Sequence, residues 1–270
     1  MIKVENTMKM NHTAILPYLE IPIVKHCNLK CKCCSHLANM ETENYADPTQ
    51  FARVMARLSV LFSEITSIRL LGGEPLLHPE LVTFAKIVRQ YFPDTLLKIV
   101  TNGLLIPKLD GEILEELSKL NVLFDVSVYP PTKRIEEKIK ARFYEFGIKF
   151  DLSPEITQFQ KRLLIEPRSN AKKAWEACAT KRCYILQGEE ISYCCVPLLE
   201  DKARDVFGLT MDVSDSRTNI FEEKWTGASL LKFLQTPHSC CAFCGVPQKV
   251  DWCITNQPKP QDWVVDEAIE

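Results

Sequence analysis

The sequence predicts an α/β fold, an incomplete barrel of strand–helix units followed by a small cysteine-rich module. Short apolar runs alternate with helix-period segments from residue 19 to residue 152, and beyond residue 154 the alternation stops where eight of the twelve cysteines are found. Repeated strand–helix units imply a parallel sheet with right-handed crossovers. Five or six units are too few to close an eight-stranded barrel. We therefore expect an open barrel at residues 1–153 and a separate module at residues 154–270.

The expected strands and helices follow one another in a regular order. Residues 19–25 form an extended run that enters a cysteine loop, and Pro48 stands where a helix can start, because its ring suits the first helical position. Phe51, Val54 and Leu58 then recur at helical spacing. By the same criteria, further strands are expected at residues 68–71, 96–100, 122–128 and 148–152, and further helices from Pro79 and through residues 113–120 and 135–146.

The composition excludes several classes of function. The 270 residues are 46% hydrophobic and 25% charged, with a formal net charge of -2. No basic block provides the electrostatic footprint of a nucleic-acid-binding protein. No apolar run is long enough for a transmembrane helix, and residues 1–10 lack the apolar core of a secretory signal. We expect a cytoplasmic protein that binds neither nucleic acid nor a membrane.

The cysteines are too numerous for a reducing compartment unless they bind metal or carry out redox chemistry. None lies between Cys34 and Cys178, so a disulfide framework would leave the middle of the chain untied. The three groups are Cys27, Cys31, Cys33 and Cys34; Cys178, Cys183, Cys194 and Cys195; and Cys240, Cys241, Cys244 and Cys253.

The first group contains a C-x3-C-x2-C motif made by Cys27, Cys31 and Cys34. Three thiolates on a tight loop suit a [4Fe–4S] cluster whose fourth iron has no protein ligand. That iron is then free to chelate the amine and carboxylate of a small molecule, as catalytic metal sites keep one position open. A closed structural zinc site is the alternative, with Cys33 or His36 as the fourth ligand.

A second motif, Gly72-Gly73-Glu74-Pro75, separates the second expected strand from the following helix. Glycines there expose backbone polar groups at the carboxyl end of the strand, where barrel folds place their sites. A tight strand–helix turn would explain the glycines by themselves. The two motifs together are far more specific than either alone.

With both motifs present, the chain resembles the radical S-adenosylmethionine (SAM) superfamily over residues 19–152. Thr101-Asn102-Gly103, a common strand ending in these enzymes, adds to the resemblance. It implies an incomplete (β/α)6-type TIM barrel and a SAM-binding [4Fe–4S] cluster on the three cysteines of the motif. It also implies that Gly72, Gly73 and Glu74 hold the methionine amino group of SAM and that Ser127 meets the ribose.

One residue departs from the family pattern. Cys33 stands where these enzymes usually have an aromatic residue, and its thiol could compete for the cluster. The choice of Cys34 over Cys33 therefore rests on the family spacing.

The later cysteines predict a second metal site. Cys178 and Cys194 flank Gly188, and Cys241 and Cys244 form a C-x2-C pair, so four thiolates could close a zinc or cluster site. In this context they resemble the twitch module, a half-length relative of the SPASM extension, which implies an auxiliary [4Fe–4S] cluster on these four residues. The spacing from Gly188 to Cys194 is one residue longer than in that family, and the full SPASM cysteine run is absent. Cys183 and Cys240 are the alternative ligands.

Packing explains the remaining cysteine and the tryptophans of this region, which are Cys253, Trp175, Trp225 and Trp252.

The resemblance also implies a reaction. A reduced cluster would cleave SAM to a 5'-deoxyadenosyl radical, which removes a hydrogen atom from the substrate. We expect an oxidoreductase or epimerase of a sugar or aminocyclitol, similar to 2-deoxy-scyllo-inosamine dehydrogenase, with a flavodoxin- or ferredoxin-type electron donor. A radical SAM maturase or epimerase of peptides is the alternative within the family. A non-catalytic zinc or iron–sulfur interaction protein is the alternative outside it.

Overall fold

The computed structural model describes residues 14–208 and 213–270, and its centre is an eight-stranded sheet of order β11-β10-β9-β2-β4-β5-β6-β7. Five neighbouring strands run parallel, as the strand–helix repeat predicts. These strands are β2 (Leu19–Val24), β4 (Ser67–Gly72), β5 (Leu96–Thr101), β6 (Leu123–Val126) and β7 (Lys149–Leu152). All five carry their carboxyl ends to the same edge of the sheet. Closure into a partial barrel remains a prediction.

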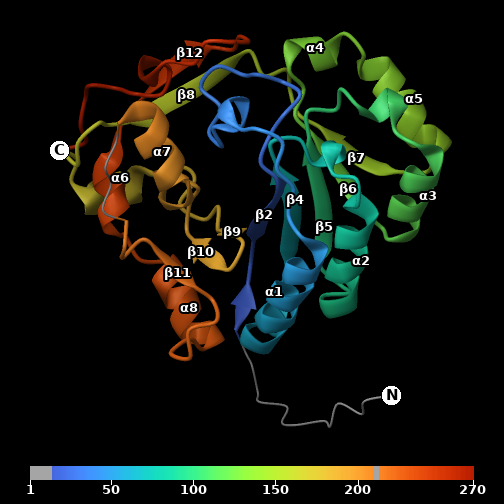
Figure 1. Cartoon of the computed structure of the whole chain (residues 1–270), viewed down its shortest axis with the longest axis horizontal. Helices are drawn as coiled ribbons and strands as arrows, with labels where there is room; N and C mark the ends of the chain where they lie inside the picture. The colour runs from blue at the N-terminus through green and yellow to red at the C-terminus, as the bar shows by residue number, and fades with distance from the viewer. Residues whose placement is uncertain (1–13, 209–212) are drawn as a thin grey trace.

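Helices connect the parallel strands and cover one face of the sheet (Figure 1). In α1 the predicted apolar stripe is buried, and Asp47 caps the helix by accepting a hydrogen bond from the Gln50 amide at 2.7 Å. Helix α2 begins two residues after Pro79, because the His78 ring accepts the Glu80 amide and holds residues 78–80 as a turn. The helices are α1 (Pro48–Leu61), α2 (Leu81–Tyr91), α3 (Gly111–Lys119), α4 (Pro130–Lys133) and α5 (Glu136–Glu145).

The later part of the chain adds three strands to the same sheet, of which the first runs parallel to β2 and the next two pair antiparallel with their neighbours. Strand β9 (Ile185–Gln187) lies beside β2, where Glu20 pairs with Ile185, and β10 (Glu190–Ser192) and β11 (Arg217–Asn219) follow outward. Helices α6, α7 and α8 lie with these strands, on the left of β2 in Figure 1. Their bounds are Ala171–Ala177, Glu200–Phe207 and Gly227–Leu234.

Two short ladders lie outside the main sheet. Strand β8 (Gln158–Leu163) pairs antiparallel with β12 (Cys244–Asp251), and β1 (Ile15–Leu16) pairs with β3 (Glu64–Ile65). One continuous apolar core joins residues from both parts of the chain, including Phe124 of β6 and Ile191 of β10. The loss of strand–helix alternation after residue 154 thus does not separate the cores. The boundary near residue 154 stays a prediction.

Within residues 14–208 and 213–270, the structure contains no helix with the length and apolar character needed to cross a membrane.

Candidate cofactor and metal sites

The first cysteine loop follows β2 at the carboxyl edge of the sheet. The Cys27 and Cys31 thiols lie close enough to Cys34 to influence each other electrostatically. Burial raises the pKa of Cys27 and of Cys31 to about 12, with smaller contributions from the neighbouring thiols. Burial likewise raises the pKa of Cys34. The three predicted ligands therefore lie near one another, where a cation would stabilise their thiolate forms.

Each of these sulfurs receives N–H donors from the protein. Cys27 Sγ accepts from the Leu29 amide at 3.4 Å and from Asn102 Nδ2 at 3.6 Å. Cys31 Sγ accepts from the Trp252 indole N–H at 3.2 Å. The backbone amides of residues 36–38 favour the Cys34 thiolate and lower its pKa against the effect of burial. Such donors stabilise thiolates bound to iron and tune a cluster. The chemistry of this donor set fits a [4Fe–4S] cluster.

Cys33 lies apart from these donors. It has a left-handed backbone conformation, with φ of 60°, and its side chain is buried with Leu37 and Trp263 in a small apolar cluster. It also lines the cavity of the C-terminal cysteines. This placement favours Cys34 over Cys33 as the third ligand of the loop.

The two glycines of the second motif bring β4 against the backbone that leads into Cys27. A Cβ at Gly72 would lie 1.9 Å from the Val24 carbonyl oxygen, and a Cβ at Gly73 would lie 1.9 Å from that of His26. Gly72 also has a φ of 140°, which side chains rarely adopt. The Gly73 amide donates to Val24 O at 2.7 Å. Only glycine permits this close approach of the two segments.

Glu74 is fully buried, and its carboxylate ties its own segment to the end of β5. Its carboxylate accepts from Thr101 Oγ1 at 2.6 Å, the Asn102 amide at 2.8 Å and the Leu76 amide at 3.0 Å. Burial raises the pKa of Glu74 to about 7, although these three donors oppose the shift. Because the Glu74 side chain is fully buried and hydrogen-bonded within the protein, contact between Glu74 and SAM would come from its backbone.

Ser127 lies at the same edge, directly after β6. Its amide donates to Thr101 O at 2.9 Å, which places it beside the strand ending Thr101-Asn102-Gly103. Asn102 reaches across to the cysteine loop, where its amide donates to Asn28 Oδ1 at 2.8 Å. The resemblance identified the strand ending but not this contact.

Sequence reasoning missed an aromatic pair beside the loop. The rings of Tyr129 and Trp252 are stacked with centroids 5.7 Å apart and an interplanar angle of 17°. Burial, followed by the neighbouring thiols of Cys31 and Cys34, raises the pKa of Tyr129. Nothing in the spacing predicted that a tryptophan 221 residues from Cys31 would reach it.

The C-terminal cysteines surround a cavity of about 320 Å³. All four predicted auxiliary ligands line it, each from a different element: Cys178 after α6, Cys194 after β10, Cys241 in the 3₁₀ turn Ser239–Phe243, and Cys244 at the start of β12. Cys33, Cys183, Cys195 and Cys240 also line this cavity.

Several thiols of this cavity are hydrogen-bonded to one another. Cys240 bonds with Cys194 and Cys241, and the Tyr193 hydroxyl lies 2.6 Å from Cys240 Sγ and 3.1 Å from Cys241 Sγ. Burial raises the pKa of Cys244 to about 12. The chemistry of these thiols suits a cluster, and it leaves Cys240 and Cys241 equally placed as ligands.

All twelve cysteines lie in the described parts of the chain and are free thiols. Within the same residues, no three His, Cys, Asp or Glu side chains converge in the arrangement that holds a single metal ion.

A smaller polar cavity of about 190 Å³ adjoins the second glycine motif. Its wall includes Gly72 and Val24 from the strand ends and Gln187 from β9. Cys195 and His36 line both this cavity and the cysteine cavity. The two spaces are therefore neighbours.

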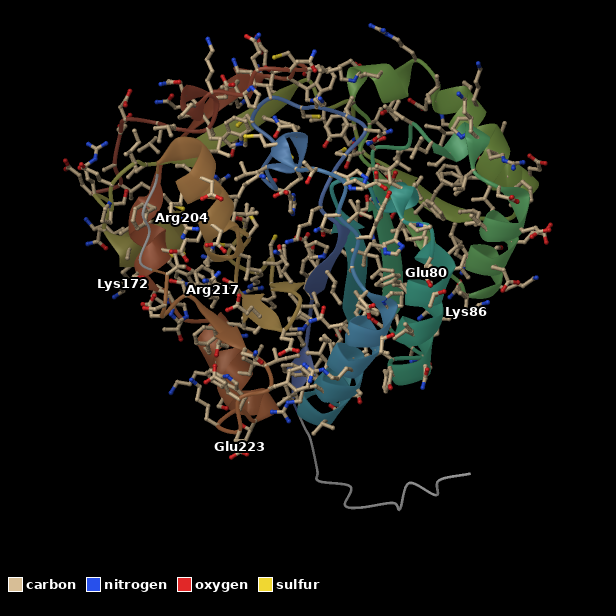
Figure 2. The ribbon with its side chains drawn as sticks, in the orientation of Figure 1. Glu80, Lys86, Lys172, Arg204, Arg217 and Glu223 are labelled. Atoms are coloured by element: carbon tan, nitrogen blue, oxygen red, sulfur yellow. The ribbon has the colours of Figure 1, made fainter. Side chains whose placement is uncertain are left out.

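Charged side chains close the other side of the polar cavity. Lys202 lies 3.3 Å from Glu41, and both line it. Arg217, labelled in Figure 2, donates to Glu200 Oε2 at 3.2 Å and to Pro197 O at 3.3 Å. These bonds fix the start of α7 against β11 and so hold the cavity wall.

Comparison with known proteins identifies the first part of the chain. Residues 21–147 match the model of the radical SAM superfamily. These residues form a radical SAM domain. The two cysteine and glycine motifs lie inside this range, so the family expected from the motifs is confirmed for the domain.

Individual relatives match over shorter stretches. The chain is 28% identical over 116 residues to a GTP 3',8-cyclase of Sulfurovum sp. (strain NBC37-1), which covers 42% of this chain and 36% of the relative. It is 33% identical over 89 residues to the GTP 3',8-cyclase of Nautilia profundicola, which covers 33% of this chain and 28% of the relative. The chain thus spans 36% of the first of these curated relatives and 28% of the second.

Solved structures are similar at low identity. BtrN in complex with AdoMet and 2-DOIA is 18% identical with a TM-score of 0.49, covering 85% of this chain and 92% of that one. Native anSMEcpe with bound AdoMet is 18% identical with a TM-score of 0.39, covering 50% of this chain and 44% of that one. SuiB of Streptococcus suis, bound to the precursor peptide SuiA, is 14% identical with a TM-score of 0.43, covering 87% and 70%.

Proposed function

We propose that this chain is a radical SAM enzyme with two iron–sulfur centres, which acts on a small polar substrate of the sugar or aminocyclitol class. The observation that carries the proposal is the first cysteine loop. Three thiols there lie beside the strand ends of a radical SAM domain, and each receives N–H donors of the kind that support cluster thiolates.

Cys27, Cys31 and Cys34 would hold the first cluster, and SAM would bind at the strand ends beside it. When bound, the cluster and SAM supply a 5'-deoxyadenosyl radical that abstracts a hydrogen atom from the substrate. The backbone of Gly72 and Gly73 and the Ser127 side chain would position SAM. The buried Glu74 carboxylate accepts hydrogen bonds from Thr101 and Asn102. It would therefore hold the end of β5 against the glycine motif rather than form an ion pair with SAM.

Cys178, Cys194, Cys241 and Cys244 would hold the auxiliary cluster. Four thiols from four elements around one cavity support this assignment. Cys240 is the alternative to Cys241 because its sulfur bonds with Cys194. Cys183 is the other substitute. The auxiliary centre would accept an electron from the substrate or contribute to its binding, and the first cluster would be reduced by a flavodoxin- or ferredoxin-type protein.

The polar cavity beside Gly72 supports a small substrate. Its volume of about 190 Å³ suits a monosaccharide-sized molecule better than a peptide segment, and Lys25, Gln187 and Lys202 supply hydrogen-bond donors. Cys195 and His36 connect it to the cysteine cavity. His36 Nε2 is buried without a hydrogen-bond partner among the described residues, so a substrate hydroxyl could provide one.

The test is SAM cleavage by the full chain after anaerobic reconstitution. We expect about eight iron atoms and eight sulfides per chain and formation of 5'-deoxyadenosine with SAM and dithionite. Adding a panel of monosaccharides and aminocyclitols should stimulate that turnover when the right one is present. A colourless zinc protein, or two complete clusters without 5'-deoxyadenosine, contradicts the proposal.

A further inference from the structure

The segment that follows β12 lies directly against the first cysteine loop. The Lys32 amide donates to Cys253 O at 2.8 Å, and the Thr255 amide donates to Lys30 O at 2.9 Å. Cys31 and Ile254 form an antiparallel bridge between these bonds. The C-terminal part of the chain thus holds the backbone of the loop on both sides of Cys31.

Trp252, at the start of this segment, both packs against the loop and donates a hydrogen bond to it. Its indole N–H, the ring's single donor, points to Cys31 Sγ at 3.2 Å. The ring is stacked on Tyr129, which also meets Phe159 of β8 edge-on at 5.8 Å. The Trp252 backbone amide donates to Thr157 O at 2.8 Å. These contacts fix the direction in which the indole N–H points.

A single strand connects this donor to the other group of cysteines. β12 begins at Cys244, in the wall of the cysteine cavity, and ends at Asp251, the residue before Trp252. Its pairing with β8 runs through Val250 and Phe159, and Phe159 supports Tyr129. The position of the indole is therefore set by the same strand that carries a proposed auxiliary ligand.

We propose that Trp252 is a positioning residue that raises the reduction potential of the cluster on the first loop. Reduction adds negative charge to the cluster and its thiolates, and an N–H donor on Cys31 Sγ stabilises that charge. The C-terminal part of the chain thereby helps to set how easily the N-terminal cluster is reduced. The inference rests on the proposed function, which makes Cys31 a ligand.

Trp263 provides a matched control in the same region. Its indole N–H donates to the Cys34 backbone oxygen at 2.8 Å, and the neighbouring Asp262 lies 3.1 Å from Lys32 Nζ. The single N–H of Trp263 therefore ties the loop through a backbone oxygen rather than through a sulfur. Trp225, whose indole donates to Thr218 Oγ1 at 3.0 Å, is a control distant from the loop.

The experiment is a potentiometric titration followed by electron paramagnetic resonance on the full reconstituted chain. The first cluster is identified as the signal that SAM perturbs. Trp252→Phe keeps a ring to stack on Tyr129 and removes the N–H. We expect its first cluster to be on the order of tenfold less reduced at a fixed potential, which corresponds to a shift of about 59 mV to more negative values. Trp263→Phe and Trp225→Phe should leave the potential unchanged.

An unchanged potential in Trp252→Phe at full iron content overturns the inference. An equal shift in Trp263→Phe also overturns it, because loop position would then be the cause rather than the bond to sulfur. Failure of the proposed function has a different signature: the native chain then holds both clusters and forms no 5'-deoxyadenosine from SAM, while the shift in Trp252→Phe is still measured on the signal that Cys27→Ser removes.

Discussion

The two groups of cysteines differ in how the chain assembles them. Cys27, Cys31 and Cys34 come from one loop, and their sulfurs accept N–H donors from outside the group. The four proposed C-terminal ligands come from four separate elements. The neighbouring Cys240 bonds with two of them, Cys194 and Cys241. The first group is arranged to stabilise thiolates, whereas in the second group the Cys240 sulfur lies among the Cys194 and Cys241 sulfurs and the Tyr193 hydroxyl. The difference supports an open reactive centre in the loop and a closed auxiliary centre in the cavity.

The largest effect should follow from removing one ligand of each group. Cys27→Ser should abolish SAM cleavage, a loss on the order of 10³-fold or more, because the reactive centre loses a ligand. Cys194→Ser should retain SAM cleavage without substrate. Each variant should contain about four irons per chain rather than about eight. Equal loss of SAM cleavage in both would erase the distinction between the two groups.

The approach of β4 to the loop can be tested with glycine substitutions. Gly73→Ala places a Cβ against the His26 carbonyl oxygen and should destabilise the protein by about 3 kcal/mol while displacing the loop. Gly188→Ala meets nothing within 4 Å and is strained only by its φ of +60°, so it should cost about 1 kcal/mol. Urea denaturation gives both values, and a smaller cost for Gly73→Ala would show that the contact is not tight.

The burial of Glu74 predicts a pH dependence of stability. Its pKa is raised from 4.5 to about 7, so the folded state binds a proton more tightly than the unfolded state. The contribution of Glu74 to the free energy of unfolding is therefore fully present below pH 4.5 and is lost as the pH rises through 7. This loss lowers the free energy of unfolding by at most about 3 kcal/mol. Urea midpoints of native protein and Glu74→Gln, compared between pH 5 and pH 8, measure it. A native curve parallel to that of the variant would show that Glu74 does not titrate in this range.

The smallest effect is expected at Cys33. Cys33→Ala removes a thiol that packs with Leu37 and Trp263 and should keep full iron content and SAM cleavage. Its stability should fall by about 1 kcal/mol, as for loss of a small buried group. Cys34→Ala should lose the first cluster. Loss of the first cluster in Cys33→Ala would show that Cys33, rather than Cys34, is the third ligand.

Features with local causes were predictable from the sequence. The helix of Pro48 and the five parallel strands follow from periodicity, and the C-x3-C-x2-C loop follows from spacing within eight residues. The glycine motif was also identified, and its steric reason, the approach to Val24 and His26, required coordinates.

Features that depend on topology could not be predicted. The Trp252 indole reaches Cys31 only because β12 pairs with β8, and the Glu74 carboxylate is occupied only because β5 lies beside β4. Spacing suggested the four auxiliary cysteines but could not choose between Cys240 and Cys241, which are adjacent and both face the Tyr193 hydroxyl. A contact such as that of Trp252 with Cys31, which are 221 residues apart, leaves no periodicity or spacing in the sequence from which it could be predicted.

The first cysteine loop is proposed to hold a cluster with one iron open to SAM. Electron–nuclear double resonance of the reduced chain with SAM labelled by ¹⁵N in its amino group tests it most directly. We expect a hyperfine coupling between that nitrogen and the cluster in native protein and in Cys194→Ser, and none in Cys27→Ser. Full iron content without any coupling in native protein would contradict it.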